Sequence, residues 1–85
     1  MMYMYIGQGS VLMTEDVIGI FDLDITSQSH ITRAFLNAAE KRGEVVNASE
    51  DIPKSFLLCC AEGSEKVYLC QPSTGTLLRR AENGI

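Results

Sequence analysis

The hydrophobic positions of this chain gather in short runs separated by turn residues, which is a pattern typical of short strands. Runs rich in β-branched and aromatic residues occupy residues 4–6, 11–14 and 17–21, and the glycines within residues 7–10 predict a turn between the first two. The first quarter of the chain is therefore predicted to form a hairpin or a meander. Further short strands are predicted at residues 44–47, 55–60 and 66–71.

Helical periodicity is clearest over residues 28–42, where apolar side chains recur three and four positions apart. The hydroxyl-rich segment at residues 26–29 suits a helix N-cap, because its side-chain oxygens can accept the first free backbone N–H groups. Gly43 stands where a glycine ends a helix in the left-handed conformation. The sequence predicts one main helix ending just before Gly43.

A second, shorter helix is predicted near the C-terminus. Pro72 ends the preceding strand, Ser73 can cap the helix, and Leu77, Leu78 and Ala81 supply its apolar stripe. With 85 residues, the whole chain from 1 to 85 is predicted to be a single domain. Its fold class is α+β, with a small mixed or antiparallel sheet of about five short strands, one main helix and a short C-terminal helix.

Two of the predicted strands, residues 17–21 and 56–60, are apolar on both faces. A sheet with one solvated face would alternate apolar and polar residues, so both faces of these strands must be covered. The main helix can cover one face, and little beyond the short terminal helix is left for the other. Packing against a second copy of the chain is the expected solution, and a sheet curled into a small barrel is the alternative.

The composition and the charge layout limit the function. No run reaches the roughly 18 apolar residues of a membrane span, and residues 1–10 lack the features of a secretory signal. Three cysteines make no disulfide framework, so a cytoplasmic location is expected. The net charge of −4 comes from the first 32 residues, which contain acids but no Lys or Arg. This layout does not suggest strong affinity for phosphates.

Several residues could in principle carry chemistry, but each has a simpler explanation. The Gly7-Gln8-Gly9 segment leads into a strand and not a helix, so a hairpin turn is favoured over a phosphate loop. Asp22 and Asp24 could share a hard cation, but a solvated strand end explains them better.

The thiols and the histidine offer no catalytic or metal-binding pattern either. Cys59 and Cys60 lie on opposite faces of one strand, and one of them could lie across from Cys70 on the neighbouring strand. His30, in the first helical turn, has no nucleophile or carboxylate partner that a motif would identify. We expect no enzyme activity, no cofactor and no metal site.

The basic residues give the remaining candidate site, a nucleic-acid contact made by Lys54, Lys66, Arg79 and Arg80. One copy offers only these few cations, which makes a weak anion site. Repeated around a symmetric oligomer, the same cations would form a belt.

Three parts of the chain carry a family likeness in a consistent order. These are residues 4–22 with the string Asp16-Val17-Ile18-Gly19-Ile20-Phe21-Asp22, the segment Pro53-Lys54-Ser55 before an apolar strand, and the tail at residues 73–81. Together they resemble the extracellular matrix regulator family RemA/RemB, and RemB more than RemA. The likeness begins at Met4, which would make residues 1–3 an N-terminal extension outside the core.

The resemblance implies a bacterial, cytoplasmic, ring-shaped oligomer that regulates biofilm matrix genes, with RemA presenting arginines to DNA. Those arginines are not matched here, because Asp16, Asp51 and Ile52 stand near their positions and only Lys54 keeps a positive charge in that region. The resemblance thus supports an oligomeric regulator more strongly than it supports DNA binding.

The alternative function is a protein-interaction adaptor or structural oligomer that does not itself bind DNA. In that case the acidic first third of the chain, with Glu15, Asp16, Asp22 and Asp24, would meet a basic partner such as a RemA-like paralogue.

Overall fold

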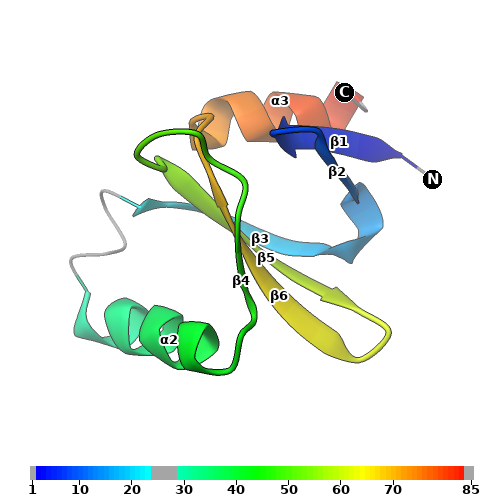
Figure 1. The fold of residues 1–85 in the computed structure, drawn as a ribbon. Helices are drawn as coiled ribbons and strands as arrows, with labels where there is room; N and C mark the ends of the chain where they lie inside the picture. The colour runs from blue at the N-terminus through cyan, green and yellow to red at the C-terminus, as the bar shows by residue number, and fades with distance from the viewer. Residues whose placement is uncertain (1, 24–28, 84–85) are drawn as a thin grey trace.

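The structure, a computed structural model, describes residues 2–23 and 29–83 of the chain. A four-stranded sheet lies between two layers (Figure 1): one helix covers one face, and a two-stranded hairpin with the last helix covers the other. In chain order the elements are β1 (Tyr3–Gly7), β2 (Ser10–Met13), the 3-10 helix η1 (Thr14–Asp16), β3 (Val17–Asp22), α2 (His30–Lys41), β4 (Val45–Asn47), β5 (Ser55–Ala61), β6 (Ser64–Cys70) and α3 (Thr74–Asn83).

The strands are divided between two sheets. β1 and β2 form an antiparallel pair, and the larger sheet has the order β3-β5-β6-β4, with β4 parallel to β6 and the other neighbours antiparallel. The predicted α+β class is confirmed, although the described residues form six strands in two sheets and not a single sheet of about five. The 3-10 turn η1 separates β2 from β3, so the third strand starts the second sheet and does not extend the hairpin.

Turn chemistry sets both tight hairpins. In the first, Gln8 and Gly9 have φ values of 50° and 76° between the paired residues Gly7 and Ser10. Positive φ at both central positions is the turn that matches the right-handed twist of paired strands. The β5–β6 turn repeats this arrangement with φ values of 54° at Glu62 and 79° at Gly63. The predicted turn at residues 7–10 is therefore confirmed as a hairpin.

The ends of α2 agree with the sequence. Ser29 is the N-cap, and its Oγ accepts a hydrogen bond from the backbone N–H of Thr32 at 3.4 Å. At the other end Gly43 has a φ of 72°, and the N–H of Glu44 donates to the carbonyl of Ala39 at 2.9 Å. This is the glycine-ended closure that the sequence predicts. Residues 26–28, also predicted as cap and first turn, lie outside the described residues.

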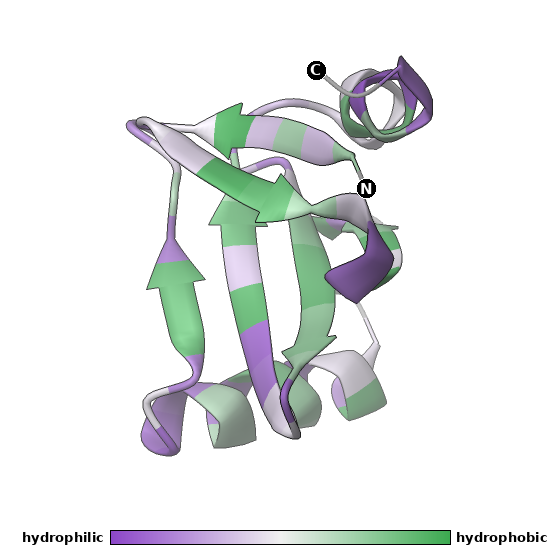
Figure 2. Cartoon of the chain, turned by 90° about the vertical axis from the view of Figure 1, so that its right-hand side faces the viewer, coloured by the Kyte–Doolittle hydropathy of each residue, from purple (hydrophilic) through white to green (hydrophobic). Residues whose placement is uncertain are grey.

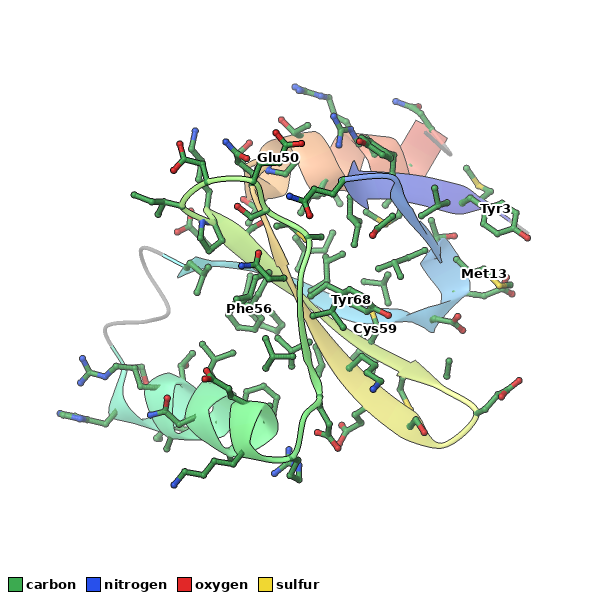
Figure 3. All side chains as sticks on the ribbon, in the orientation of Figure 1. Tyr3, Met13, Glu50, Phe56, Cys59 and Tyr68 are labelled. Atoms are coloured by element: carbon green, nitrogen blue, oxygen red, sulfur yellow. The ribbon has the colours of Figure 1, made fainter. Side chains whose placement is uncertain are left out.

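Alternating side chains of the central sheet build two hydrophobic clusters. On one face Leu57 and Cys59 of β5 pack against Met4 and Ile6 of β1 and Leu77 of α3. On the other face the cluster comes from the sheet and from α2, and its members are Phe21, Leu23, Phe35, Leu36, Ala39, Val45, Phe56, Leu58, Val67 and Leu69. The rings of Phe21 and Phe56 stack there with centroids 4.9 Å apart. Figure 3 shows Phe56 directed toward α2.

Both faces of β5 are thus covered by elements of the same chain, although Leu58 and Cys60 stay half-buried and Ala61 is exposed. The hairpin and α3 supply the layer that the sequence pattern left unassigned, so the expectation that little remained to cover the second face is wrong. The small barrel is wrong as well, because the sheet is open, with β3 and β4 at its edges. Self-association stays a prediction, and the burial of β5 no longer requires it.

The other doubly apolar strand, β3, is an edge strand. Its register against β5 shifts between Val17 and Gly19, and the side chain of Ile18 at this bulge is 61% exposed. β3 therefore buries only part of its apolar surface within the chain. In Figure 2 the green colour along the strands contrasts with the hydrophilic η1 that precedes β3. Within residues 2–23 and 29–83, no helix has the length and apolar character needed to span a membrane.

Candidate nucleic-acid interface between the first strand and the last helix

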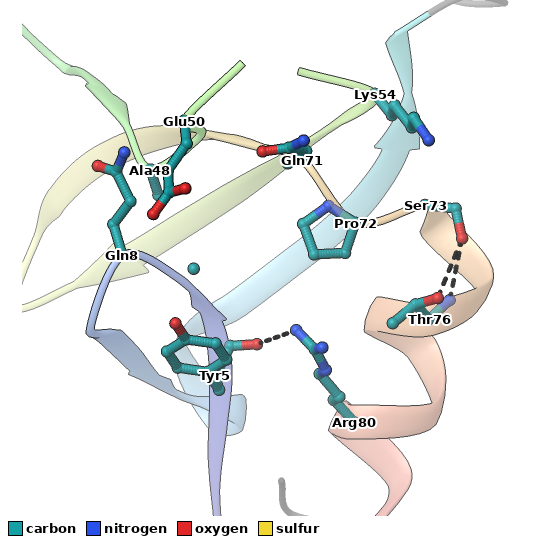
Figure 4. A pocket seen from close by; sticks show the side chains of 11 residues that line it. Tyr5, Gln8, Ala48, Glu50, Lys54, Gln71, Pro72, Ser73, Thr76 and Arg80 are labelled. Atoms are coloured by element: carbon teal, nitrogen blue, oxygen red, sulfur yellow. Dashed lines mark hydrogen bonds between the residues drawn. The ribbon is translucent and has the colours of Figure 1, made fainter. Parts of the chain in front are cut away.

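A shallow cavity of about 520 Å³ lies between β1, the loop before β5 and the start of α3 (Figure 4). Two of the four predicted cations, Lys54 and Arg80, line it together with Tyr5, Gln8 and Glu50. We call this cavity the α3 groove. It joins residues from the beginning, middle and end of the chain, so only the folded protein creates it.

Helix α3 positions Arg80. Ser73 caps the helix, because its Oγ accepts the N–H of Thr76 at 3.3 Å, and buried Leu77 anchors the helix in the core. Arg80, one turn later, lies against β1: its Nη1 donates to the carbonyl of Tyr5 at 3.0 Å, and its guanidinium carbon lies 5.5 Å from the Tyr5 ring centroid. This cation–π contact and hydrogen bond fix Arg80 at the wall of the groove.

Arg79 is the more accessible of the two arginines. Its side chain is exposed, and its Nη2 donates to Oγ1 of Thr76 at 3.4 Å. Arg79 and Arg80 border a second shallow hollow next to the α3 groove, together with Asn83. The paired arginines therefore form one basic surface on α3, with Arg80 held by β1 and Arg79 directed to solvent.

Lys54 reaches the groove from the start of β5. Its backbone is fixed at both polar groups, since its N–H donates to Cys70 O and its carbonyl accepts from the N–H of Leu23, at 2.9 and 3.0 Å. The next residue, buried Ser55, donates its hydroxyl to the carbonyl of Pro72 at 2.8 Å. The exposed ammonium of Lys54 thus sits on a rigid base at a margin of the groove away from Arg80.

The fourth predicted cation, Lys66, lies elsewhere. It pairs with Cys59 near the β5–β6 turn and lines a separate hollow of about 260 Å³ that also contains Asp16 and Glu62. The structure therefore brings Lys54, Arg79 and Arg80 to one side of the molecule and leaves Lys66 apart, beside carboxylates.

The acidic residues of the first third do not form one patch. Glu15 and Asp16 lie in η1, before β3, whereas Asp22 ends the same strand. A strand of six residues spans roughly 17–20 Å, so the two groups stand at opposite ends of β3. Asp24, the other half of the predicted carboxylate pair, lies outside the described residues.

The thiols are core residues. Burial raises the pKa of Cys70 to about 12 and, with a smaller contribution from the charge of Asp16, that of Cys59 to about 11. Cys59 pairs with Lys66 and Cys60 with Glu65, whereas Cys70 pairs with Ser55, so the expected placement of Cys59 or Cys60 across from Cys70 is wrong. Within the described residues no cluster of His, Cys, Asp and Glu is arranged to hold a metal ion.

Tyr5 is the groove residue that the sequence reasoning missed. It belongs to a strand in which polar and apolar side chains alternate: Met4 and Ile6 are buried, and the tyrosines at positions 3 and 5 point outward. This alternation, together with the absence of any charged residue from position 2 to position 13, was the available signal.

Comparison with known proteins adds a relative. No family model matches the chain. The sequence is 31% identical over 81 residues to the extracellular matrix regulatory protein B of Bacillus subtilis (strain 168), and the match covers 95% of this chain and 91% of that protein.

Proposed function

The chain belongs to the family of the extracellular matrix regulatory protein B, and we propose that it is a non-enzymatic, oligomeric regulator that binds duplex DNA and controls matrix genes. The observation that carries the DNA contact is that Lys54 and Arg80 line the α3 groove and that Arg79 borders the adjoining hollow together with Arg80. A DNA-binding regulator of this kind would act in the bacterial cytoplasm.

The oligomer is part of the proposal because one copy has too few cations. Three cations beside a carboxylate, Glu50, make a weak phosphate contact, and the chain as a whole is negative. Affinity that comes from counterion release grows with the number of phosphates neutralised, so several copies of this basic surface on one duplex would bind far more tightly.

The surface that supports self-association is the free edge of β3. Edge strands offer unpaired backbone groups to another chain, and proteins usually protect such edges with charges or prolines. In β3 the one charged residue is Asp22 at its end; residues 17–21 contain no charged residue and no proline, and Ile18 at the bulge is exposed. We infer that a second copy pairs along this edge.

Duplex binding is measured by fluorescence polarisation, with a labelled promoter fragment and a labelled random fragment, at about 50 and 200 mM salt. Lys54→Ala and Arg79→Ala should each weaken binding. Each should also reduce the slope of log affinity against log salt concentration by about 1 for every phosphate contact that is lost in each bound copy. Lys41→Ala, an exposed lysine in the last turn of α2, is the matched control, and Lys66→Ala tests the cation outside the groove. Absence of duplex binding at low salt, or equal losses in the control, would refute the DNA contact.

Oligomerisation is tested by light scattering at micromolar concentration. The wild type should give a multiple of the 9.3 kDa chain mass, and Ile18→Lys should lower the mass by placing a charge on the β3 edge. Ile52→Lys is the control, because Ile52 is also exposed but lies in the loop before β5. A wild type that remains monomeric contradicts this part of the proposal.

The adaptor alternative has less support, because η1 and the end of β3 hold their carboxylates at opposite ends of the strand. A pull-down with the charge-reversed Glu15/Asp16 variant tests it separately. Recovery of partners equal to that of the wild type would exclude an acidic docking surface there.

A further inference from the structure

The outer face of the β1–β2 hairpin differs from the rest of the surface. Residues 2–13 contain no charged side chain, and Tyr3, Tyr5 and Val11 are 50%, 41% and 53% exposed. Tyr5 pairs with Val11 and Tyr3 pairs with Met13, so these four side chains share one face of the hairpin. Figure 3 shows Tyr3 projecting away from the sheet layer. An aromatic and aliphatic strip thus lies partly exposed beside the basic residues of α3.

The ring of Tyr5 is held in place before any ligand arrives. Arg80 lies over the ring at 5.5 Å and bonds to the carbonyl of the same residue. At the turn, the N–H of Gly9 donates to the phenolic oxygen of Tyr5 at 3.4 Å. A ring fixed from two sides loses little rotamer freedom on binding, which favours its use as a rigid contact surface.

We propose that this face binds single-stranded nucleic acid, with bases stacked on Tyr3 and Tyr5 and phosphates contacted by Arg79, Arg80 and Lys54. Aromatic side chains on strands, flanked by cations, are the general means by which proteins hold unpaired bases. Every base has a π-face, so such contacts need no particular sequence.

The spacing of the two tyrosines selects an unpaired strand. Residues two apart on a strand are about 7 Å from each other, which is about twice the separation of stacked bases in a duplex. Neighbouring bases can therefore use both rings only if they are splayed apart. A single strand permits this, whereas a duplex keeps its bases stacked and presents only grooves and phosphates.

The tyrosine rings and the cations near Tyr5 favour nucleic acid over a second copy of the chain as the occupant of this face. The strip itself is uncharged, and beside it α3 carries Arg79 and Arg80 with one acid, Glu82, while the α3 groove carries Lys54 with Glu50. The acids Glu15 and Asp16 lie in η1, beyond the Met13 end of the strip, so the phosphates would lie at the Tyr5 end. A polyanion with planar bases complements both parts of the surface.

This inference goes beyond the proposed function, because a duplex contact through cations needs neither tyrosine ring. The two ideas share Lys54, Arg79 and Arg80, so only the tyrosines separate them. The tests therefore substitute the tyrosines and compare single-stranded with duplex ligands on the full chain.

The probes are labelled homopolymers of about 12 nucleotides, one of deoxythymidine and one of uridine, measured by fluorescence polarisation at about 50 mM salt. Tyr3→Leu and Tyr5→Leu should each weaken binding about fivefold to a hundredfold, because each removes a stacking ring but keeps an apolar side chain. Tyr3→Phe keeps the ring and should bind nearly as the wild type does. Val46→Ala, at an exposed apolar position on β4, is the control.

Intrinsic fluorescence gives a second readout. The chain has three tyrosines and no tryptophan, so stacking of bases on Tyr3 and Tyr5 should quench much of the emission. Circular dichroism of each variant confirms that the hairpin still folds. Binding of either homopolymer with loss in both leucine variants supports the proposal, and comparison of the two homopolymers shows whether DNA or RNA is preferred.

Three results would overturn it: no binding of either homopolymer by the wild type, undiminished binding by the leucine variants, or a lower oligomer mass in those variants, which would make the face a subunit contact. Failure of duplex binding with retained single-strand binding would refute the proposed function alone. Retained duplex binding with no effect of the tyrosines would refute this inference alone.

Discussion

Gly7 ends β1 with a φ of +130°, and a Cβ built on it would lie 2.7 Å from the carbonyl oxygen of Ala48. Gly9, two residues later, has a φ of +76° with open space around it. A side chain at Gly9 would therefore meet backbone strain alone, whereas a side chain at Gly7 would meet backbone strain and a clash with Ala48. This approach of the hairpin to the segment after β4 also sets one wall of the α3 groove, which Gly7 and Ala48 line.

Replacement of Gly7 should cost more than replacement of Gly9. We expect Gly7→Ala to lower the free energy of unfolding by about 2–4 kcal/mol, from strain and the clash with Ala48, and Gly9→Ala by about 1 kcal/mol, from strain alone. Urea unfolding of both variants measures the difference. Equal losses would show that the Ala48 carbonyl moves aside at no cost.

The buried thiols predict a pH dependence of stability. The pKa of Cys59 is raised from 9.0 to about 11 and that of Cys70 to about 12, so above pH 9 the unfolded chain releases protons that the folded chain keeps. Stability supplied by these thiols is complete below pH 9 and falls as the pH rises toward 11 and 12. Urea midpoints measured from pH 8 to 11 should fall more steeply for the wild type than for Cys70→Ala. Parallel curves would exclude the thiols as the cause.

At the scale of elements, α3 serves both the core and the candidate interface. Its Leu77 is fully buried against β1 and the central sheet, whereas the next residue, Leu78, is 53% exposed. The sequence predicted the helix, its Ser73 cap and its apolar stripe, but assigned both leucines to that stripe. The position of β1 beside the helix decides which leucine is inside.

Adjacent leucines in α3 should differ sharply when truncated. Leu77→Ala removes a core side chain and is expected to lower the free energy of unfolding by about 2–5 kcal/mol. Leu78→Ala should change it by no more than about 0.5 kcal/mol, because its side chain is largely in water. Thermal and urea unfolding of the two variants provide the measurement, and similar losses would mean that Leu78 is covered in an assembly.

At the scale of the whole molecule, β5 is paired with β6 along its whole length and with β3 from Ser55 to Cys59, and the outer side of β3 is a long edge of the sheet. Amides of β5 should therefore exchange with solvent most slowly. If a second copy pairs along β3, the amides on its outer edge should gain protection as the protein concentration rises. The other edge strand, β4, should not change.

Hydrogen exchange followed by mass spectrometry at several concentrations tests this expectation. Ile18→Lys provides the control, because it should keep β3 exchanging quickly at every concentration. Protection that rises on the hairpin face or on α2 instead would place the contact on another surface.

The sequence by itself determined the local structure of this protein. Turns at Gln8-Gly9 and Glu62-Gly63, the α2 end at Gly43 and the α3 cap at Ser73 follow from residues whose backbone preferences act over a few positions. The same locality explains why the class, the helices and the strand segments were predictable. The relationship to extracellular matrix regulatory protein B was also readable from ordered segments of the chain.

Only the tertiary structure shows which elements and which residues are neighbours in space. The hairpin and α3 cover the face of β5 that the sequence pattern assigned to a second copy of the chain. Arg80 contacts Tyr5, which lies 75 positions away in the chain. The fold also separates Lys66 from Lys54, Arg79 and Arg80. Hydrophobic burial is non-directional, so a pattern of apolar positions shows that a face must be covered but not which element covers it. The candidate interface exists because the fold brings β1, the loop before β5 and α3 together.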